Sequence, residues 1–276
     1  MTTIIQDKTQ SSTGMRAFEG RVAVVTGSTS GIGLGIARAL AAGGATVILN
    51  GLGDPTRMDA LCHELSEKHG VPVQYDDTDM ADGNAIAEMM ERAIRGFGTV
   101  DILVNNAGIQ HVAPIECFPP EKWQAIQAIN LAAAFHATQA VLPEMKRQGF
   151  GRIVNIASAH GLVASPFKSA YVAAKHGVIG LTKVAALEAA EHGVTCNAVC
   201  PGYVLTPLVE QQVDAQAKAH GISRDEVVRT VFLAEQPTRR FITVEEIAAA
   251  VLFLCGEPAR SITGIALPVD GGWTAH

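Results

Sequence analysis

The sequence has few aromatic residues, no excess of positive charge and no paired-cysteine motif. Aromatic residues make up 5% of 276 positions, and 21 Lys and Arg stand against 27 Asp and Glu, a formal net charge of −6. A dedicated nucleic-acid binder normally carries a basic patch, so no nucleic-acid partner is expected. Without C-x-x-C spacing, we expect neither a disulfide framework nor a metal site, and a reducing compartment, the cytoplasm, as location. The cysteines are Cys62, Cys117, Cys196, Cys200 and Cys255.

Long apolar runs are also missing. We find no uninterrupted stretch of the roughly 18 apolar residues that a membrane span needs, so no membrane partner is expected. Gln127, Asn130 and His136 interrupt one apolar helical segment. The first 14 residues are polar and lack the apolar core of a signal peptide. We expect residues 1–17 to form a flexible tail.

The rest of the chain has ample material for a core, with 48% hydrophobic residues and 27 glycines. Short β-branched runs alternate with helical segments, which is typical of parallel strands covered by helices. Without a linker in the middle, the sequence predicts one α/β domain over residues 18–276, a doubly wound parallel seven-stranded sheet of the Rossmann kind. A polar helical segment at about 206–240 has no strand partner and is expected to form a small substrate lid. Strands are expected at residues 21–26, 46–49, 71–75, 100–104, 151–156, 194–199 and 262–268, and helices at 32–42, 57–68, 84–95, 120–146 with a bend, and 169–191.

A glycine-rich turn follows the first expected strand. Residues 26–33 read TGSTSGIG and open a helix. Glycines let a backbone approach a pyrophosphate, and a helix N-terminus offers free N–H groups and a positive dipole end. A second loop, residues 105–108 (NNAG), should reach the same crevice, where Gly108 would leave room for an adenosine. The pattern predicts a dinucleotide site, with ligand-free structural turns as the alternative interpretation.

The second strand tip bears on the choice between NAD and NADP. An acidic residue about 20 positions past the glycines often binds the ribose 2′-hydroxyl of NAD. Residues 49–54 read LNGLGD, with no acidic residue at the tip itself, and neither this turn nor residues 28–30 carry Arg or Lys for a 2′-phosphate. Arg57 is the nearest cation and is expected on the following helix. The lack of basic residues favours NAD.

Ser158, Tyr171 and Lys175 have the types and spacing for proton transfer. Tyr171 and Lys175 stand four apart on one expected helix and share a face, and Ser158 ends a strand thirteen residues earlier. A neighbouring ammonium stabilises a phenolate, so Lys175 is expected to lower the pKa of Tyr171 from about 10. Ser158 could hold the substrate oxygen, and Asn130 could anchor a water next to Lys175. Taken alone, a Y-x-x-x-K pair is more often a surface feature.

These motifs, together with Pro201-Gly202, resemble in their order the short-chain dehydrogenase/reductase family from about residue 18 onward. The resemblance implies Tyr171 as acid–base, Lys175 as the group that tunes it and binds the nicotinamide ribose, Ser158 as carbonyl-orienting and Asn130 as a proton-relay residue. It implies a homotetramer built partly on the helices near 120–146 and 169–191. Implied cofactor-binding residues are Gly27, Thr29, Gly31, Ile32, Gly33, Leu52, Asp79 and Met80 beside the adenine, Asn106, Gly108, Tyr171, Lys175, Pro201, Val204, and Thr206 at the carboxamide.

Four polar residues lie where the substrate should sit, namely Gln110, His160, Lys168 and Gln212. A lysine near the phenol suits a carboxylate, so the set favours a small anionic hydroxy or keto acid. Residues 158–171 and 201–212 also resemble a subgroup that interconverts (R)-3-hydroxybutyrate and acetoacetate with NAD. That resemblance implies the four residues as the carboxylate-binding set. Tyr203 departs from it, because the subgroup tends to carry Trp there.

Other interpretations remain open. Each of the four polar residues has a structural alternative, such as a solvated lysine in a loop. The chain could reduce another ketone, as a 3-oxoacyl carrier-protein reductase does, or act as a polyol dehydrogenase. A non-catalytic nucleotide-binding regulator on the same fold is the alternative from another class, although all three of Ser158, Tyr171 and Lys175 are present.

Overall fold

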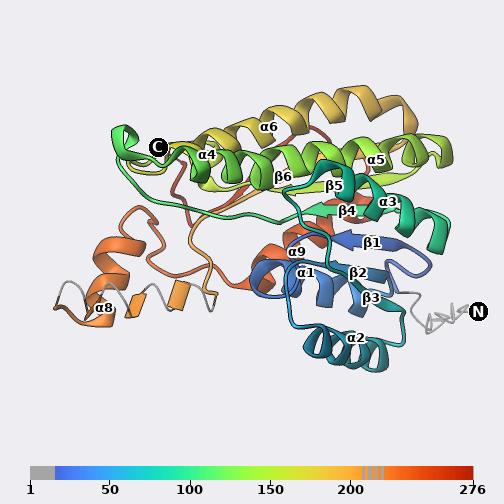
Figure 1. Ribbon diagram of the computed structural model, residues 1–276, viewed down its shortest axis with the longest axis horizontal. Coiled ribbons are helices and arrows are strands. Elements are labelled where there is room, and N and C mark those ends of the chain that lie inside the picture. Colours follow the sequence, from blue (N-terminus) through green and yellow to red (C-terminus); the bar gives the residue numbers. More distant parts are fainter. Residues whose placement is uncertain (1–15, 207–208, 211–212, 215–216, 219–220, 276) are drawn as a thin grey trace, which may run out of the picture.

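The computed structural model describes residues 16–206, 209–210, 213–214, 217–218 and 221–275. Seven parallel strands form one sheet in the order β3-β2-β1-β4-β5-β6-β7 (Figure 1), which confirms the predicted doubly wound fold. The order reverses between β1 and β4, where such sheets open a crevice at the carboxyl ends of the strands. The strands are β1 Val22–Val25, β2 Thr46–Asn50, β3 Val73–Asp76, β4 Ile102–Asn105, β5 Gly151–Ile156, β6 Val194–Pro201 and β7 Ala266–Val269.

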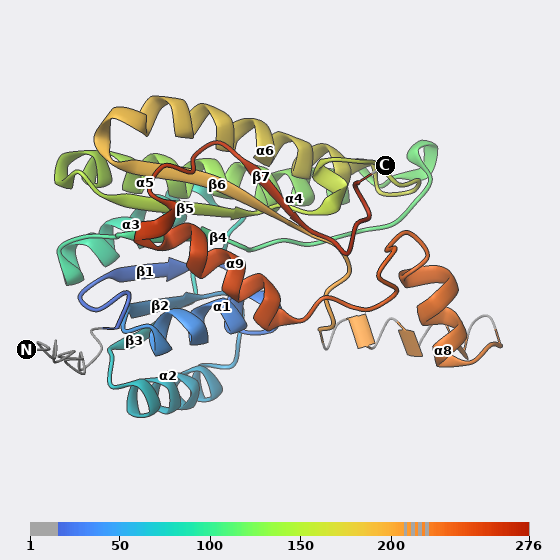
Figure 2. The same ribbon diagram turned by 180° about the vertical axis from the view of Figure 1, so that it is seen from behind.

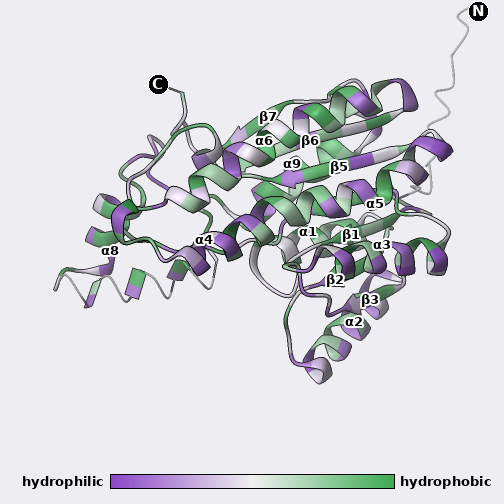
Figure 3. Ribbon diagram, turned by 45° about the horizontal axis from the view of Figure 1, so that its top comes forward, coloured by the Kyte–Doolittle hydropathy of each residue, from purple (hydrophilic) through white to green (hydrophobic). Residues whose placement is uncertain are grey.

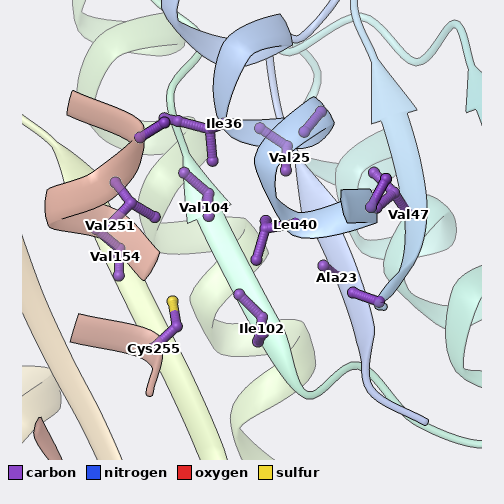
Figure 4. Close-up of a cluster of buried hydrophobic side chains, with 14 of the residues drawn as sticks. Ala23, Val25, Ile36, Leu40, Val47, Ile102, Val104, Val154, Val251 and Cys255 are labelled. Carbon is purple, nitrogen blue, oxygen red and sulfur yellow. The ribbon is translucent and has the colours of Figure 1, made fainter. Parts of the chain in front are cut away.

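Helices cover both faces of the sheet (Figure 2). On one face, α1 and α9 pack side chains such as Ile36 and Val251 onto the strands (Figure 4). On the other, α3, α5 and α6 bury residues such as Met89 and Val141. Helices such as α3 carry both hydrophobic and hydrophilic residues along their length (Figure 3), as expected for one buried face. The helices are α1 Gly31–Ala42, α2 Pro55–His69, α3 Gly83–Phe97, α4 Pro120–Gln127, α5 Ala133–Gln148, α6 Ser169–Ala189, α8 Arg224–Val227 and α9 Val244–Cys255.

Helix ends follow local capping chemistry. Asp54 accepts a hydrogen bond from the Arg57 N–H at the start of α2, and Gly70 ends that helix at φ +62°. Thr243 and Glu246 form a capping box at the start of α9. Such caps satisfy N–H groups that a helix leaves unpaired and each stabilises its helix by about 1 kcal/mol. They explain why α2 begins and ends close to the predicted residues 57–68, whereas α9 was not among the predicted helices.

The bend predicted within residues 120–146 is a π-helical turn, Ala128–Ala132, between α4 and α5. Among the described residues, Pro120–Gln148 is long and apolar enough, by length and composition alone, to cross a membrane, which differs from our expectation. The core helix of a soluble protein passes the same test. Here α5 packs against α3 and α6 and supplies buried side chains such as Val141 and Met145 to the core.

The two ends of the chain differ from the prediction in detail. Residues 1–15 of the expected tail lie outside the described residues. Arg16, also expected in the tail, donates a hydrogen bond to the His69 carbonyl and therefore belongs to the folded part. The last strand begins four residues later than predicted, because Gly264 has φ +77°, which interrupts extended backbone.

The expected lid segment leaves the carboxyl edge of the sheet. In its described part, α8 and the π-turn Val228–Phe232 project away from the sheet (Figures 1 and 2). Buried Val213, Val227, Phe232 and Leu233 give this segment a small core of its own. Although the segment is rich in polar residues, it therefore folds around an apolar centre.

Candidate active site

The glycine-rich turn between β1 and α1 is shaped by two close backbone contacts. Gly27 has φ +61°, and a Cβ there would lie 2.8 Å from Ala107 Cα. A Cβ at Gly33 would lie 2.4 Å from the Gly27 carbonyl oxygen and 2.5 Å from Asn106 Nδ2. Side chains at either position would fill the turn. The glycines are therefore required by the packing of the turn itself.

The NNAG loop holds this turn, as the sequence suggested. Asn106 Nδ2 donates to the carbonyls of Thr26, at 3.0 Å, and Gly27, at 2.9 Å. Thr26 Oγ1 in turn accepts hydrogen bonds from the N–H groups of Asn106 and Ala107. Asn105 Nδ2 donates to Asn155 Oδ1 at 2.8 Å and so ties β4 to β5. The two loops form one rigid unit at the crevice.

The N-terminus of α1 opens onto this unit. Its N-cap, Ser30, makes no side-chain capping bond, and the first turn carries no acidic residue. The positive end of the α1 dipole therefore has no acidic side chain beside it in the first turn. The N–H groups of Ile32 and Gly33 face the glycine-rich turn. This cradle of glycines and free N–H groups suits the pyrophosphate of a nicotinamide dinucleotide.

Thr29 and Thr206 flank the turn. Thr29 Cγ2 lies 3.1 Å from the place that a Cβ at Gly51 would occupy, which puts this threonine against the end of β2. Thr206 Cγ2 lies 3.6 Å from the corresponding place at Gly31, so the start of the lid segment touches the start of α1. A further contact brings Gly108 to Asn130, whose Oδ1 is 3.6 Å from a Cβ position at Gly108.

The tip of β2 carries a structural asparagine. Asn50 is fully buried; its Oδ1 accepts from the Gly27 N–H and its Nδ2 donates to the Thr78 carbonyl at 2.9 Å. The next side chain along, Leu52, is 81% exposed. Arg57 lies on α2, as expected. The tip thus offers an apolar side chain and no charge to a ribose.

Two predicted adenine residues behave differently. Asp79 is exposed after β3, and its Oδ1 accepts from the Ala81 N–H at 2.9 Å. Met80 is only 6% exposed and belongs to the core between the sheet and α3, so little of its side chain is open to the crevice. Its place beside the adenine stays a prediction. At the other side of the crevice, Pro201 ends β6 and buried Val204 pairs with Ile242.

The structure brings Ser158, Tyr171 and Lys175 together. Ser158 follows β5 and caps a short 3₁₀ turn, Ala159–Gly161. Tyr171 and Lys175 share one face of α6, and Lys175 Nζ lies 5.6 Å from the centre of the Tyr171 ring. The same ammonium donates a 2.7 Å hydrogen bond to the Ile156 carbonyl at the end of β5. The strand thus fixes the cation that the helix places beside the phenol.

The pKa values depart from the expectation for this pair. Burial raises the pKa of Tyr171 above its usual value of 10, and a hydrogen bond with Ser158 offsets this only in part. Burial lowers the pKa of Lys175 to about 8. The direction is opposite to the lowering expected for the phenol, because loss of hydration outweighs the hydrogen bond with Ser158. At neutral pH the phenol keeps its proton and Lys175 remains mostly charged.

Asn130 sits in the π-helical turn that separates α4 from α5. Its Oδ1 accepts from the Ile109 N–H at 2.8 Å and its Nδ2 donates to the Ile109 carbonyl at 2.9 Å. A cavity of about 10 Å³ lies between Asn130 and Lys175, with the buried Asn105 Oδ1 unpaired among the described residues. That is room for about one water with polar partners, as the predicted relay requires. Single-turn π-helices often occur at functional sites.

His160 and Lys168 border the same space. His160 is 5% exposed, its Nε2 lies 2.8 Å from Ser165 Oγ, and its ring contacts the edge of Tyr171 at 6.1 Å between centroids. Burial, with the charge of Lys168, lowers the pKa of His160 to about 4, so the imidazole is neutral at physiological pH. Burial also lowers the pKa of Lys168. Gln110 is exposed on the loop after NNAG, and Gln212 lies outside the described residues.

The aromatic wall at Tyr203 includes two rings, Trp273 and Phe232, that the sequence did not indicate. Trp273 stacks on Tyr203, with centroids 5.5 Å apart and planes at 12°, and its edge contacts His160 at 4.9 Å. Phe232 of the lid segment packs against Tyr203 at 5.4 Å. Trp273 lies about a hundred positions from Tyr171, so no spacing rule connects the two. Only its place after the D-G-G turn near the C-terminus was available as a signal.

In the described parts of the chain, no three His, Cys, Asp or Glu residues gather closely enough to hold a metal ion. The polar groups that the site brings together are the Tyr171 phenol, the Ser158 hydroxyl and the ammonium groups of Lys168 and Lys175. This arrangement can bind a small anion next to a proton donor at the mouth of a dinucleotide crevice.

The fold and this site define a nicotinamide-dependent oxidoreductase, and comparison with known proteins gives its family. Residues 21–217 match the short chain dehydrogenase family, and the chain belongs to it. It is 54% identical over 256 residues to a D-beta-hydroxybutyrate dehydrogenase of Rhizobium meliloti, covering 93% of this chain and 99% of the relative. It is 56% identical over 260 residues to one of Cupriavidus necator, covering 94% and 100%.

A solved structure shows the same fold. L-sorbose reductase from Gluconobacter frateurii, complexed with NADPH and L-sorbose, superposes with a TM-score of 0.89 at 32% identity, covering 95% of this chain and all of that one. The chain therefore shares the single-domain fold of this structure, and its family membership implies a nicotinamide dinucleotide cofactor. That relative binds NADPH, so the family alone does not choose between the two dinucleotides.

Proposed function

We propose that the protein is an NAD-dependent oxidoreductase that interconverts (R)-3-hydroxybutyrate and acetoacetate. The observation that carries the proposal is the ammonium of the partly buried Lys168. It lies next to Tyr203, in a row of aromatic rings that reaches Tyr171 through Trp273 and His160. A cation in that position suits a substrate carboxylate. The names of the two D-beta-hydroxybutyrate dehydrogenase relatives, at 54% and 56% identity, support the same substrate.

The end of β2 supports NAD rather than NADP. A 2′-phosphate needs a cation near the ribose, and the residues next to the tip, Gly51 and Leu52, offer none. Buried Asn50 is committed to its bonds with Gly27 and Thr78. Leu52, 81% exposed, would instead cover the ribose with an apolar side chain.

The proposed mechanism uses the protein's own groups for proton transfer and positioning. When bound at the glycine turn, NAD would supply the hydride acceptor for C3 of the alcohol, taking one proton with two electrons, and the hydroxyl proton is lost as the ketone forms. Ser158 Oγ holds the alcohol oxygen, and Tyr171 Oη takes its proton in oxidation and returns it in reduction. Because burial raises the pKa of Tyr171, the phenol is ready to donate at neutral pH, and oxidation requires the charge of Lys175 to stabilise the phenolate.

The remaining predicted residues take supporting roles. Lys168 holds the carboxylate, and neutral His160, Gln110 and Gln212 add hydrogen bonds. Asn130 keeps a water in contact with Lys175, which connects the phenol to solvent. The segment at 206–240 closes over the substrate and excludes water. Its first residue, Thr206, already lies against Gly31 at the start of α1.

We also propose a cytoplasmic homotetramer, without nucleic-acid or membrane partners. The outer faces of α5 and α6 leave apolar side chains in solvent, with Phe135 45%, Val184 52% and Leu187 81% exposed. A groove between them is lined by Leu142, Leu181 and neighbouring residues. Paired helices of this kind suit a second copy of the chain.

The proposed function is tested by measuring NADH formation with a panel of alcohols. We expect oxidation of (R)-3-hydroxybutyrate with NAD, little with the (S) enantiomer and little with NADP. The panel also includes polyols as alcohol substrates. A separate assay measures reduction of 3-oxoacyl thioesters with NADH or NADPH. Preference for a polyol or a thioester, or for NADP, would contradict the proposal.

A further inference from the structure

We propose that the hydroxyl of Tyr203 is a specificity-determining group that, together with Lys168, holds the substrate carboxylate. This inference rests on the proposed function and assigns a further residue to its substrate site. Lys168 Nζ lies 3.4 Å from the Tyr203 hydroxyl, to which it donates, and 5.7 Å from the centre of the ring. Two groups that can each donate a hydrogen bond to a carboxylate therefore stand next to each other.

The Tyr203 ring is fixed before any substrate arrives. It stacks on Trp273 at 12° and meets the edge of Phe232. Its backbone N–H donates to the side-chain oxygen of Gln236, which is fully buried and also donates to the Arg240 carbonyl. A donor held by so many contacts loses little freedom on binding, which favours affinity.

The hydrogens on Lys168 and on the Tyr203 hydroxyl are also arranged to bind a carboxylate. Because Lys168 donates to the Tyr203 oxygen, the hydroxyl hydrogen of Tyr203 is free to point elsewhere. Burial raises the pKa of Tyr203, so this hydrogen stays in place through the neutral and mildly alkaline range. A carboxylate next to both groups can accept one hydrogen bond from the ammonium and a second from the phenol.

The identity of the residue makes this a property of the present chain. Phenylalanine or tryptophan at this position would keep an aromatic ring but would carry no hydroxyl. Tyrosine retains the stacking on Trp273 and adds an O–H at the position that contacts Lys168. We therefore expect this enzyme to discriminate strongly between a carboxylate and an uncharged group of similar size.

The test compares Tyr203→Phe with the unaltered enzyme on two substrates, (R)-3-hydroxybutyrate and its methyl ester. Phenylalanine keeps the ring and its stacking and removes only the hydroxyl. We expect kcat/KM for the acid to fall on the order of tenfold or more, as for loss of a hydrogen bond to a charged group, and kcat/KM for the ester to fall much less. The ratio of the two is independent of the fraction of folded enzyme.

A second arm combines Tyr203→Phe with Lys168→Met. The selectivity is the ratio of kcat/KM for the acid to kcat/KM for the ester. If both groups hold one carboxylate, this ratio falls in the double variant by a smaller factor than the product of the factors for the two single variants. Equal losses for acid and ester in Tyr203→Phe, or no loss for either, would overturn the inference while leaving the proposed function intact. Unaltered enzyme that oxidises neither compound would contradict the proposed function, and the inference with it.

Discussion

Lys175 Nζ lies 5.6 Å from the centre of the Tyr171 ring, with its hydrogen bond made to a neutral carbonyl, that of Ile156. Because this partner carries no negative charge, the ammonium's field stays available to the phenol one helical turn away. Both side chains are poorly hydrated, which strengthens their mutual influence. The relationship places the phenol that we propose as the proton-transfer group beside a cation at the carboxyl edge of the sheet.

Replacing Gly33 by alanine is expected to disrupt the cofactor turn. The new methyl group would lie 2.4 Å from the Gly27 carbonyl oxygen and 2.5 Å from Asn106 Nδ2, so the turn must shift. We expect NAD affinity to fall at least about tenfold and the free energy of unfolding to fall by about 1–3 kcal/mol. Calorimetric titration with NAD and urea unfolding measure the two effects.

Gly96→Ala is the matched control, because Gly96 lies within α3 with nothing within 4 Å of its Cβ position. Alanine there is expected to stabilise the helix by about 0.5–1 kcal/mol. Unaltered NAD affinity in Gly33→Ala would argue against the assigned cradle.

Replacing Lys168 by methionine tests the carboxylate assignment. Methionine keeps an apolar stem of similar length while removing the ammonium. We expect KM for (R)-3-hydroxybutyrate to rise about tenfold or more, and KM for NAD to change little, because the ammonium faces the aromatic wall rather than the glycine turn. Initial-rate kinetics with each substrate varied in turn give both constants. An equal rise in both would count against the assignment.

Most of the fold followed from the sequence because its signals are local. The strands expected at 151–156 and 194–199 reappear as β5 and β6, which are buried along their whole length between the helix layers. The turn at residues 26–33 and the spacing of Tyr171 and Lys175 similarly depend on neighbours in the chain. Parallel pairing then brings the ends of β1, β4 and β5 to one edge.

What the sequence could not supply depends on contacts between distant segments. The stacking of Trp273 on Tyr203 joins residues seventy positions apart, and nothing in either local sequence indicates it. Met80 is buried in the core, and its local sequence did not distinguish this position from an exposed one beside an adenine. The direction of the Tyr171 pKa shift likewise needs the balance between burial and charge, which only the folded surroundings determine.

The buried imidazole of His160 predicts a loss of stability in acid. Its pKa is about 4 in the folded protein and near 6.5 when unfolded, so protonation favours the unfolded chain. The stabilising effect is complete above pH 6.5 and is lost as the pH falls toward 4, by up to about 1.4 kcal/mol per pH unit. Urea unfolding at several pH values should show a shallower decline for His160→Asn than for the unaltered protein. Parallel curves would refute this role.

Phe167 predicts a stabilising substitution. Its φ is +67°, a left-handed conformation that is strained for a phenylalanine, and its side chain is 56% exposed. Phe167→Gly should therefore raise the free energy of unfolding by about 0.5–1 kcal/mol. Phe253→Gly, at an exposed phenylalanine within α9, is the control and should lower it by about 1 kcal/mol. A loss of stability in both variants would contradict the strain argument.

The most direct test of the account is the rate of NADH formation from (R)-3-hydroxybutyrate by Tyr171→Phe. The substitution keeps the ring on α6 beside Lys175 and removes only the group that exchanges the proton. The account predicts that kcat falls at least about a hundredfold at saturating NAD and substrate. A kcat close to that of the unaltered enzyme would contradict it.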